Sequence, residues 1–293
     1  MSSAVRVRAF AKINLSLRVL GRRGDGYHEL RTISQSIALH DTLTIGRRRG
    51  AFRLTCDDPA CPSDESNLVW RAADRMWRAA GRRGGVRDVS VHVTKRIPLQ
   101  AGLGGGSSDA AAALRAFARL WRVDESAVRQ AARDLGADVP YFLEGGTVLG
   151  LERGDLLFPL IDHPPAWVVI ALPAFGVGTK EAFGWWTAQR AGGSRRSGFT
   201  SRVGSGDLLV NDLQGPVAAH HPEIGRIVRA LRAEGAGHAA MSGSGSAVFA
   251  LFERRRDAGR AAAALGSRAP RSKVSAIVTR TVNRSTYQRL AAK

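Results

Sequence analysis

The segment 98–109 (PLQAGLGGGSSD) concentrates the residue types that bind phosphate. It holds four glycines and ends in two serines and an aspartate. Alternating residues at 89–93 precede it and an alanine-rich stretch at 110–121 follows it, so we expect a strand, a loop and a helix. Glycines let the backbone approach an anion, and the first turn of a helix offers unpaired N–H groups. The segment therefore predicts a phosphate site.

The alternative to a phosphate site is an ordinary turn in which Ser107 or Ser108 caps the helix. Two widespread phosphate motifs are excluded. G-x-x-x-x-G-K-[ST] needs a lysine after the glycines, and G-x-G-x-x-G needs a glycine where Ser107 stands. Any phosphate bound here is expected to contact backbone N–H groups and not a loop lysine.

Two charged residues elsewhere have both a structural and a chemical interpretation. Asp138 precedes Val-Pro, a pattern typical of a helix N-cap. Lys12 lies inside an alternating apolar stretch, where burying an ammonium without a counter-charge is costly, although an edge position would let its head reach water. Asn14 shares the face of Lys12 two residues on.

Apolar alternation and helical spacing predict a mixed α+β chain. The expected strands are 5–20, 27–39, 41–45, 52–55, 89–94, 147–151, 167–172 and 247–252, and the expected helices include 67–77, 110–121 and 125–135. A His-Pro-Pro segment at 163–165 predicts a boundary between two domains, 1–163 and 164–293. The glycine-, serine- and arginine-rich stretch 191–206 is expected to be a mobile loop.

The net charge of +19 and the pI near 11.4 raise the question of nucleic-acid binding. The arginines are scattered and lack interleaved aromatics, and an anionic small substrate would also gain from a positive field. No window of about 18 apolar residues predicts a membrane span, and no signal peptide is recognised. Cys56 and Cys61 without nearby ligands favour reduced thiols over zinc. We therefore expect a cytoplasmic protein that binds neither membrane nor nucleic acid.

Three stretches together resemble the GHMP small-molecule kinases: 11–15 (AKINL), 98–109 and 241–249 (MSGSGSAVF). With 25–28 (DGYH) and 135–140 (LGADVP), they are most similar to the branch whose acceptor is a cytidine diphosphate-linked methylerythritol. The resemblance implies a two-domain fold with an N-terminal ATP-binding domain and a C-terminal α/β substrate domain. It also implies phosphorylation of an alcohol, the 2-hydroxyl of that acceptor, in the non-mevalonate isoprenoid pathway.

ATP with Mg²⁺ is the phosphoryl donor that this resemblance implies. Ser108 is a candidate ligand of the metal, whose other ligands the motifs do not indicate. The residues expected to bind ATP are Pro98, Leu99, Gln100, Ala101, Gly102, Leu103, Gly104, Gly105, Gly106, Ser107, Ser108, Asn67 and Lys95. The second glycine turn, 243–245, is expected to pack beside the first.

The resemblance also assigns the catalytic pair and the acceptor site. Asp138 would deprotonate or orient the acceptor hydroxyl, and Lys12 would pair with Asp138 and place positive charge near the phosphoryl group. The residues expected to bind the acceptor are Asn14, Tyr27, His28, Thr179 and Phe183. Phe183 has an alternative role as helix core, and Thr179 as a helix cap.

Two other functions remain as alternatives. In another GHMP kinase, of the homoserine or mevalonate type, Tyr27-His28 would be only a turn. A basic nucleic-acid-binding protein would show strongly salt-dependent binding and no ATP turnover. The expected assembly is a monomer or weak homodimer.

Overall fold

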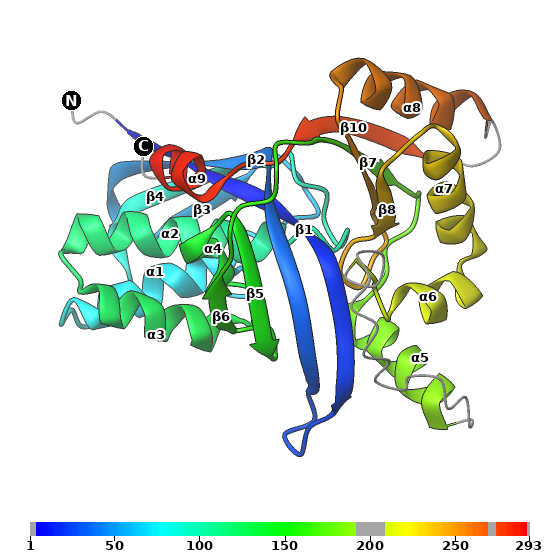
Figure 1. Cartoon of the computed structure of the whole chain (residues 1–293). Helices are drawn as coiled ribbons and strands as arrows, with labels where there is room; N and C mark the ends of the chain where they lie inside the picture. The colour runs from blue at the N-terminus through cyan, green and yellow to red at the C-terminus, as the bar shows by residue number, and fades with distance from the viewer. Residues whose placement is uncertain (1–3, 192–208, 269–273, 292–293) are drawn as a thin grey trace.

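The first two strands form a long antiparallel hairpin that runs between the two halves of the molecule (Figure 1). The computed structural model describes residues 4–191, 209–268 and 274–291. Strand β1 spans Val5–Arg22 and β2 spans His28–Ala51. The predicted strands 27–39 and 41–45 are thus one strand, because residues on both sides of position 40 continue to pair with β1. Register shifts interrupt the pairing between Phe10 and Lys12 and between Asn14 and Ser16, on either side of Lys12 and Asn14.

The hairpin belongs to a six-stranded sheet of order β3-β4-β2-β5-β6, with β1 paired to β2. The other strands are β3 (Arg53–Cys56), β4 (Arg87–Thr94), β5 (Thr147–Glu152) and β6 (Leu156–Pro159). Four helices pack with this sheet: α1 (Leu68–Ala79), α2 (Gly105–Trp121), α3 (Glu125–Leu135) and α4 (Tyr141–Glu144). Strands and helices share one apolar core, which therefore holds the start of α2 in place.

The second half is built on a four-stranded antiparallel sheet of order β10-β7-β9-β8. Its strands are β7 (Trp167–Leu172), β8 (His238–Met241), β9 (Val248–Phe252) and β10 (Ser275–Arg280). Its helices are α5 (Thr179–Ala191), α6 (Gln214–His220), α7 (Pro222–Ala233) and α8 (Arg255–Arg268). Leu17 and Val19 of the hairpin contribute to the core of this half, so β1 is shared by both halves.

Residue 163, near the expected boundary, lies between the strands of the first sheet and those of the second. The C-terminal end of the chain nevertheless packs against the N-terminal half. After β10, helix α9 (Arg284–Ala291) returns to the N-terminal half, where Tyr287 packs in a cluster with Phe10. The Val282 N–H also donates to the Ser36 carbonyl at 2.8 Å. From residue 192 on, the predicted mobile loop 191–206 lies outside the described residues. In the described part of the chain, no helix has the length and apolarity needed to cross a membrane.

Candidate active site

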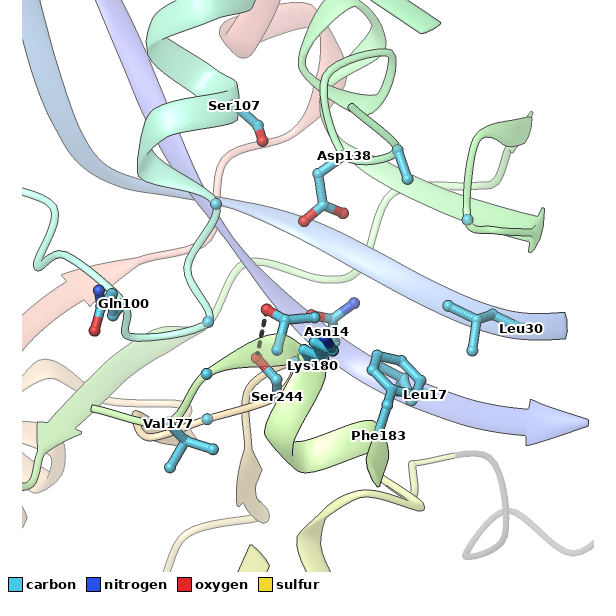
Figure 2. Close-up of a pocket in the computed structure, with 18 of the residues that line it drawn as sticks. Asn14, Leu17, Leu30, Gln100, Ser107, Asp138, Val177, Lys180, Phe183 and Ser244 are labelled. Atoms are coloured by element: carbon cyan, nitrogen blue, oxygen red, sulfur yellow. Dashed lines mark hydrogen bonds between the residues drawn. The ribbon is translucent and has the colours of Figure 1, made fainter. Parts of the chain in front are cut away.

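A cavity of about 1320 Å³ lies where the hairpin, the first glycine loop and α5 meet (Figure 2). The glycine loop contributes every residue from Pro98 to Ser107. The predicted catalytic and acceptor residues that line it are Lys12, Asn14, Tyr27, His28, Asp138, Thr179 and Phe183. One cavity thus brings together segments from both halves of the molecule, and it is large enough for two substrates.

The glycine loop ends in the N-terminus of α2 without a side-chain cap. Gly104 is the N-cap, at φ 74°, and no side chain bonds to the first N–H groups. The alternative in which Ser107 or Ser108 caps the helix is therefore excluded, and these donors remain open to a ligand. A Cβ on Gly104 would lie 2.6 Å from Phe142 Cζ, whereas one on Gly106 would meet no atom within 4 Å. Only glycine fits at Gly104, both for its φ and for this contact.

Three residues expected at the nucleotide do not line the cavity, so we revise those expectations. Ser108 is buried and donates its hydroxyl to the Phe10 carbonyl at 2.7 Å, which turns it away from any metal bound in the cavity. Asn67 is the N-cap of α1 and accepts from the Val69 N–H at 2.8 Å. Lys95 is held beneath the loop in a buried ion pair, described next.

Lys95 lies between two buried carboxylates under the glycine loop. Its ammonium donates to Asp109 Oδ2 at 2.8 Å and to Asp41 Oδ2. Asp41 also accepts the Ile97 N–H at 2.8 Å. Burial raises the pKa of Asp109 to about 7, against the lowering effect of Lys95. Since a Cβ on Gly105 would lie 3.3 Å from Lys95 Nζ, this cluster supports the loop from below.

Lys12 and Asp138 meet at the cavity surface. Lys12 Nζ is 3.5 Å from Asp138 Oδ1 and donates to Asn14 Oδ1 at 2.6 Å. The Lys12 side chain is 5% exposed, which excludes the edge position, and Asp138 is 51% exposed. Asp138 is not a helix cap, because α4 begins at Tyr141 with Pro140 before it. Figure 2 shows the Asp138 carboxylate pointing into the cavity, on the same side as Ser107.

Aromatic side chains gather at the other end of the cavity. The His28 ring stacks on Phe183 with centroids 4.7 Å apart, and Arg153 lies over the Tyr27 ring at 5.2 Å. The Thr187 hydroxyl donates to the Phe183 carbonyl at 2.9 Å, so its oxygen accepts from His28 Nε2 at 3.0 Å. Burial, with nearby Arg22, lowers the pKa of His28. The neutral ring therefore keeps Nδ1 as an acceptor.

The second glycine turn interlocks with the first, as expected from the sequence. A Cβ on Gly102 would lie 2.2 Å from the Ser242 carbonyl oxygen, and Ser242 Oγ donates to the Gly102 carbonyl at 3.0 Å. Asn211 Nδ2 supports the turn by donating to the Gly243 carbonyl at 2.8 Å. Thr179 and Ser244 bond across the cavity wall at 3.3 Å (Figure 2).

Sequence reasoning missed several residues of the cavity. Arg153 and Ser244 line it, and Asn211 supports it from behind. A lone arginine after a strand carries no local signal, and Asn211 follows the stretch that the sequence left without structure. Ser244 stands inside the second glycine turn, so the motif itself could have identified it.

Comparison with known proteins identifies relatives over nearly the whole chain. The model described as GHMP kinases N terminal domain matches residues 67–146, and the GHMP kinases C terminal model matches 202–271. Proteins named 4-diphosphocytidyl-2-C-methyl-D-erythritol kinase from Moorella thermoacetica and Anaeromyxobacter dehalogenans are 41% and 42% identical to this chain. The matches cover 94% of this chain in both cases, and 98% and 90% of those proteins.

Solved structures agree with these relatives. A crystal structure of 4-(cytidine 5'-diphospho)-2C-methyl-D-erythritol kinase matches with a TM-score of 0.75 and 34% identity, covering 94% of this chain and 99% of that one. A homoserine kinase from Cytophaga hutchinsonii matches with a TM-score of 0.69 at 20% identity, covering 97% and 96%. The second likeness shows the fold alone.

Proposed function

The chain belongs to the 4-diphosphocytidyl-2-C-methyl-D-erythritol kinases of the GHMP kinase family, and from this premise we propose how its cavity performs the reaction. The reaction transfers the γ-phosphoryl group of ATP to the 2-hydroxyl of 4-diphosphocytidyl-2-C-methyl-D-erythritol, in the non-mevalonate isoprenoid pathway. The observation that carries the proposal is the position of Lys12 and Asp138. The pair lines the same cavity as both the glycine loop and the aromatic residues.

The glycine loop holds the phosphates of ATP in this proposal. Gly104 leaves the first N–H groups of α2 without a side-chain partner, so they can donate to anionic oxygens. The positive end of the helix dipole favours the same charge. Lys95, with its carboxylate partners, acts on the loop from beneath and not on the nucleotide.

Asp138 orients the acceptor hydroxyl and accepts its proton as the oxygen attacks the γ-phosphorus. The Asp138 carboxylate is half exposed and can reach a substrate. The Lys12 ammonium is buried and is held in place by its hydrogen bond to Asn14. Lys12 pairs with the Asp138 carboxylate and offsets the charge that develops on the transferred group. Phosphoryl transfer relies mainly on such positioning and electrostatic stabilisation.

The cytidine half of the acceptor binds at the aromatic end of the cavity. Tyr27 is 55% exposed and offers a ring face that Arg153 backs on the other side. Phe183 provides a second ring, and the free Nδ1 of His28 accepts from the amino group of cytosine. Asn14 and Thr179 line the same cavity, and we assign them to the methylerythritol phosphate part of the acceptor.

Magnesium, which ATP implies, fits this cavity as an ion held mainly by the nucleotide. Among the described residues, no group of three His, Cys, Asp or Glu side chains is placed to hold a metal. Mg²⁺ commonly uses one or two protein oxygens together with substrate phosphates. The Ser107 hydroxyl, which faces the cavity, would be such a ligand, and Asp138 would stay free to accept the proton of the acceptor. When bound, the ion would neutralise phosphate charge.

A coupled ADP-release assay tests this function. With ATP present, 4-diphosphocytidyl-2-C-methyl-D-erythritol is expected to be turned over, and homoserine and mevalonate are expected to give no comparable rate. Faster turnover of either alternative acceptor would overturn the acceptor assignment. Loss of ATP turnover together with tight, salt-dependent binding of nucleic acid would instead favour the basic binding protein.

The proposal also covers the cell compartment and the oligomeric state of the enzyme. Cys56 and Cys61 are both free thiols in the structure, which supports the reducing cytoplasm as its compartment. We expect a monomer or weak homodimer, which light scattering at several protein concentrations would measure.

A further inference from the structure

The short helix α4, which follows Asp138, is held in place by side chains from distant parts of the chain. Tyr287 of α9 donates its hydroxyl to the Phe142 carbonyl at 2.7 Å. Arg115 of α2 donates to the Leu143 carbonyl. A helix of one turn leaves such carbonyls without partners of its own, and burying them unpaired costs free energy. The position of α4 is therefore set from outside.

The Phe142 ring connects α4 to the phosphate loop and to Lys12. A Cβ on Gly104 would lie 2.6 Å from Phe142 Cζ and 3.3 Å from Lys12 Cγ, so the three groups surround one point. Phe142 is 1% exposed. Because protein interiors are close-packed, a shift of α4 would move the loop and the lysine stem with it. The same shift would displace Asp138, which precedes the helix.

Tyr287 contacts the strand of Lys12 as well as α4. Its ring lies 5.4 Å from that of Phe10, two residues before Lys12 in β1. A Cβ on Gly145, at the end of α4, would lie 2.1 Å from Tyr287 Cδ1. Burial raises the pKa of Tyr287, so the hydroxyl keeps its proton and remains a donor. One side chain thus touches β1, which carries Lys12, and α4, which closely follows Asp138.

We propose that Tyr287, in the C-terminal helix, is a positioning residue for phosphoryl transfer. Its hydroxyl holds α4 against β1, and through Phe142 it sets the separation of Asp138, Lys12 and Gly104. The proposal rests on the roles of Lys12 and Asp138 given above. Small displacements of reacting groups cost rate far more than they cost binding, so the effect belongs in kcat.

Tyr287→Phe tests the proposal, because it keeps the ring and removes only the hydroxyl. We expect kcat to fall about tenfold while the KM values for ATP and for the acceptor change less than about twofold. The matched control is Thr281→Val in the same C-terminal segment, which removes a hydroxyl that accepts the Ala166 N–H at 2.9 Å. It should lower the thermal midpoint and leave kcat unchanged below the transition.

Phe142→Leu examines the second link separately, since it keeps the backbone carbonyl and loosens the ring contact. It should also lower kcat at constant KM, and Tyr287→Phe should add little in its background, because both changes interrupt one connection. If Tyr287→Phe behaves as Thr281→Val does, Tyr287 is only a stabilising contact and the proposal is wrong. It is equally wrong if Phe142→Leu has the kcat of the unaltered enzyme.

Asp138→Asn separates this proposal from the proposed mechanism. If that variant keeps its kcat, the assigned role of Asp138 fails, whatever Tyr287 does. If Asp138→Asn is inactive and Tyr287→Phe retains full kcat, only the positioning role fails.

Discussion

The Lys12 ammonium lies 3.5 Å from the Asp138 carboxylate, with the lysine buried and the aspartate half exposed. Asn14 anchors the lysine from the same strand. The buried partner is therefore fixed, while the exposed one faces the cavity in which an acceptor would lie. An ion pair of this kind contributes little to stability, because half of it stays in water. The geometry of the pair therefore suits a catalytic role better than a role in stabilising the fold.

Asp138→Asn should keep ATP binding and lower kcat by about 10²–10⁴-fold, the usual contribution of a positioned acid or base. The amide keeps the size of the side chain but cannot accept the proton from the acceptor hydroxyl. Steady-state kinetics and direct measurement of ATP affinity check this result. Asp134→Asn, which removes a surface pairing with Arg75, is the control and should leave kcat unchanged. Near-normal kcat in Asp138→Asn would remove the carboxylate from the proton-transfer role.

Gly104→Ala should raise the KM for ATP at least about tenfold, because its Cβ meets Phe142 and its φ of 74° strains any other residue. Gly81→Ala is a matched control: its φ is 72°, but a Cβ there meets nothing within 4 Å. Both variants carry the backbone strain, and only the first disturbs the loop. Equal KM values for ATP in the two variants would contradict the proposed role of the loop.

Cytidine diphosphate should inhibit competitively against the acceptor at least about tenfold more strongly than uridine diphosphate, since a mismatched hydrogen-bonding edge leaves polar groups unpaired. His28 Nδ1 accepts, which suits the amino group of cytosine and opposes the carbonyl of uracil. His28→Leu should abolish the preference. Tyr27→Ala should weaken both inhibitors equally, because stacking does not distinguish the two edges. A preference that survives in His28→Leu would assign discrimination to another group.

His238 should make the protein less stable as the pH falls. Burial, with Arg232 and His163 nearby, lowers its pKa in the fold to about 4 from an ordinary 6.5. Between these values the unfolded chain binds more protons than the folded one, so the free energy of unfolding falls as the pH drops from 6.5 to 4. His238→Gln should remove this component from a series of denaturation curves. Identical pH dependence in the two proteins would show that His238 does not titrate there.

Local sequence patterns predicted the helices and strands around the site well. They predicted the residues at which these elements begin and end less well. The strand, loop and helix at 89–121 follow from alternation, glycine and helical spacing within one short segment. Strand β2 was divided in two, because nothing local shows that pairing continues through position 40. Strand β6 and helix α9 were missed, since each is short and stabilised by the neighbours it packs against.

The placement of Lys95 illustrates the same difference. Its type and position beside the glycine loop were consistent with a nucleotide contact. The structure instead pairs it with Asp41 and Asp109, and Asp41 comes from another strand. A buried charged side chain needs an opposite charge nearby to offset the free-energy cost of its burial. Which side chain provides that charge depends on how the elements pack.

The sequence by itself determined the glycine loop, the helix that follows it and the presence of Lys12 and Asp138 in family motifs. These properties depend on backbone freedom and hydrogen bonds among neighbouring residues, which short patterns encode. Only the tertiary structure decided that Lys12 reaches Asp138, that Lys95 supports the loop, and that Tyr287 joins α4 to β1. Such contacts arise when distant segments bury their apolar faces together, and no local pattern records which segments will meet.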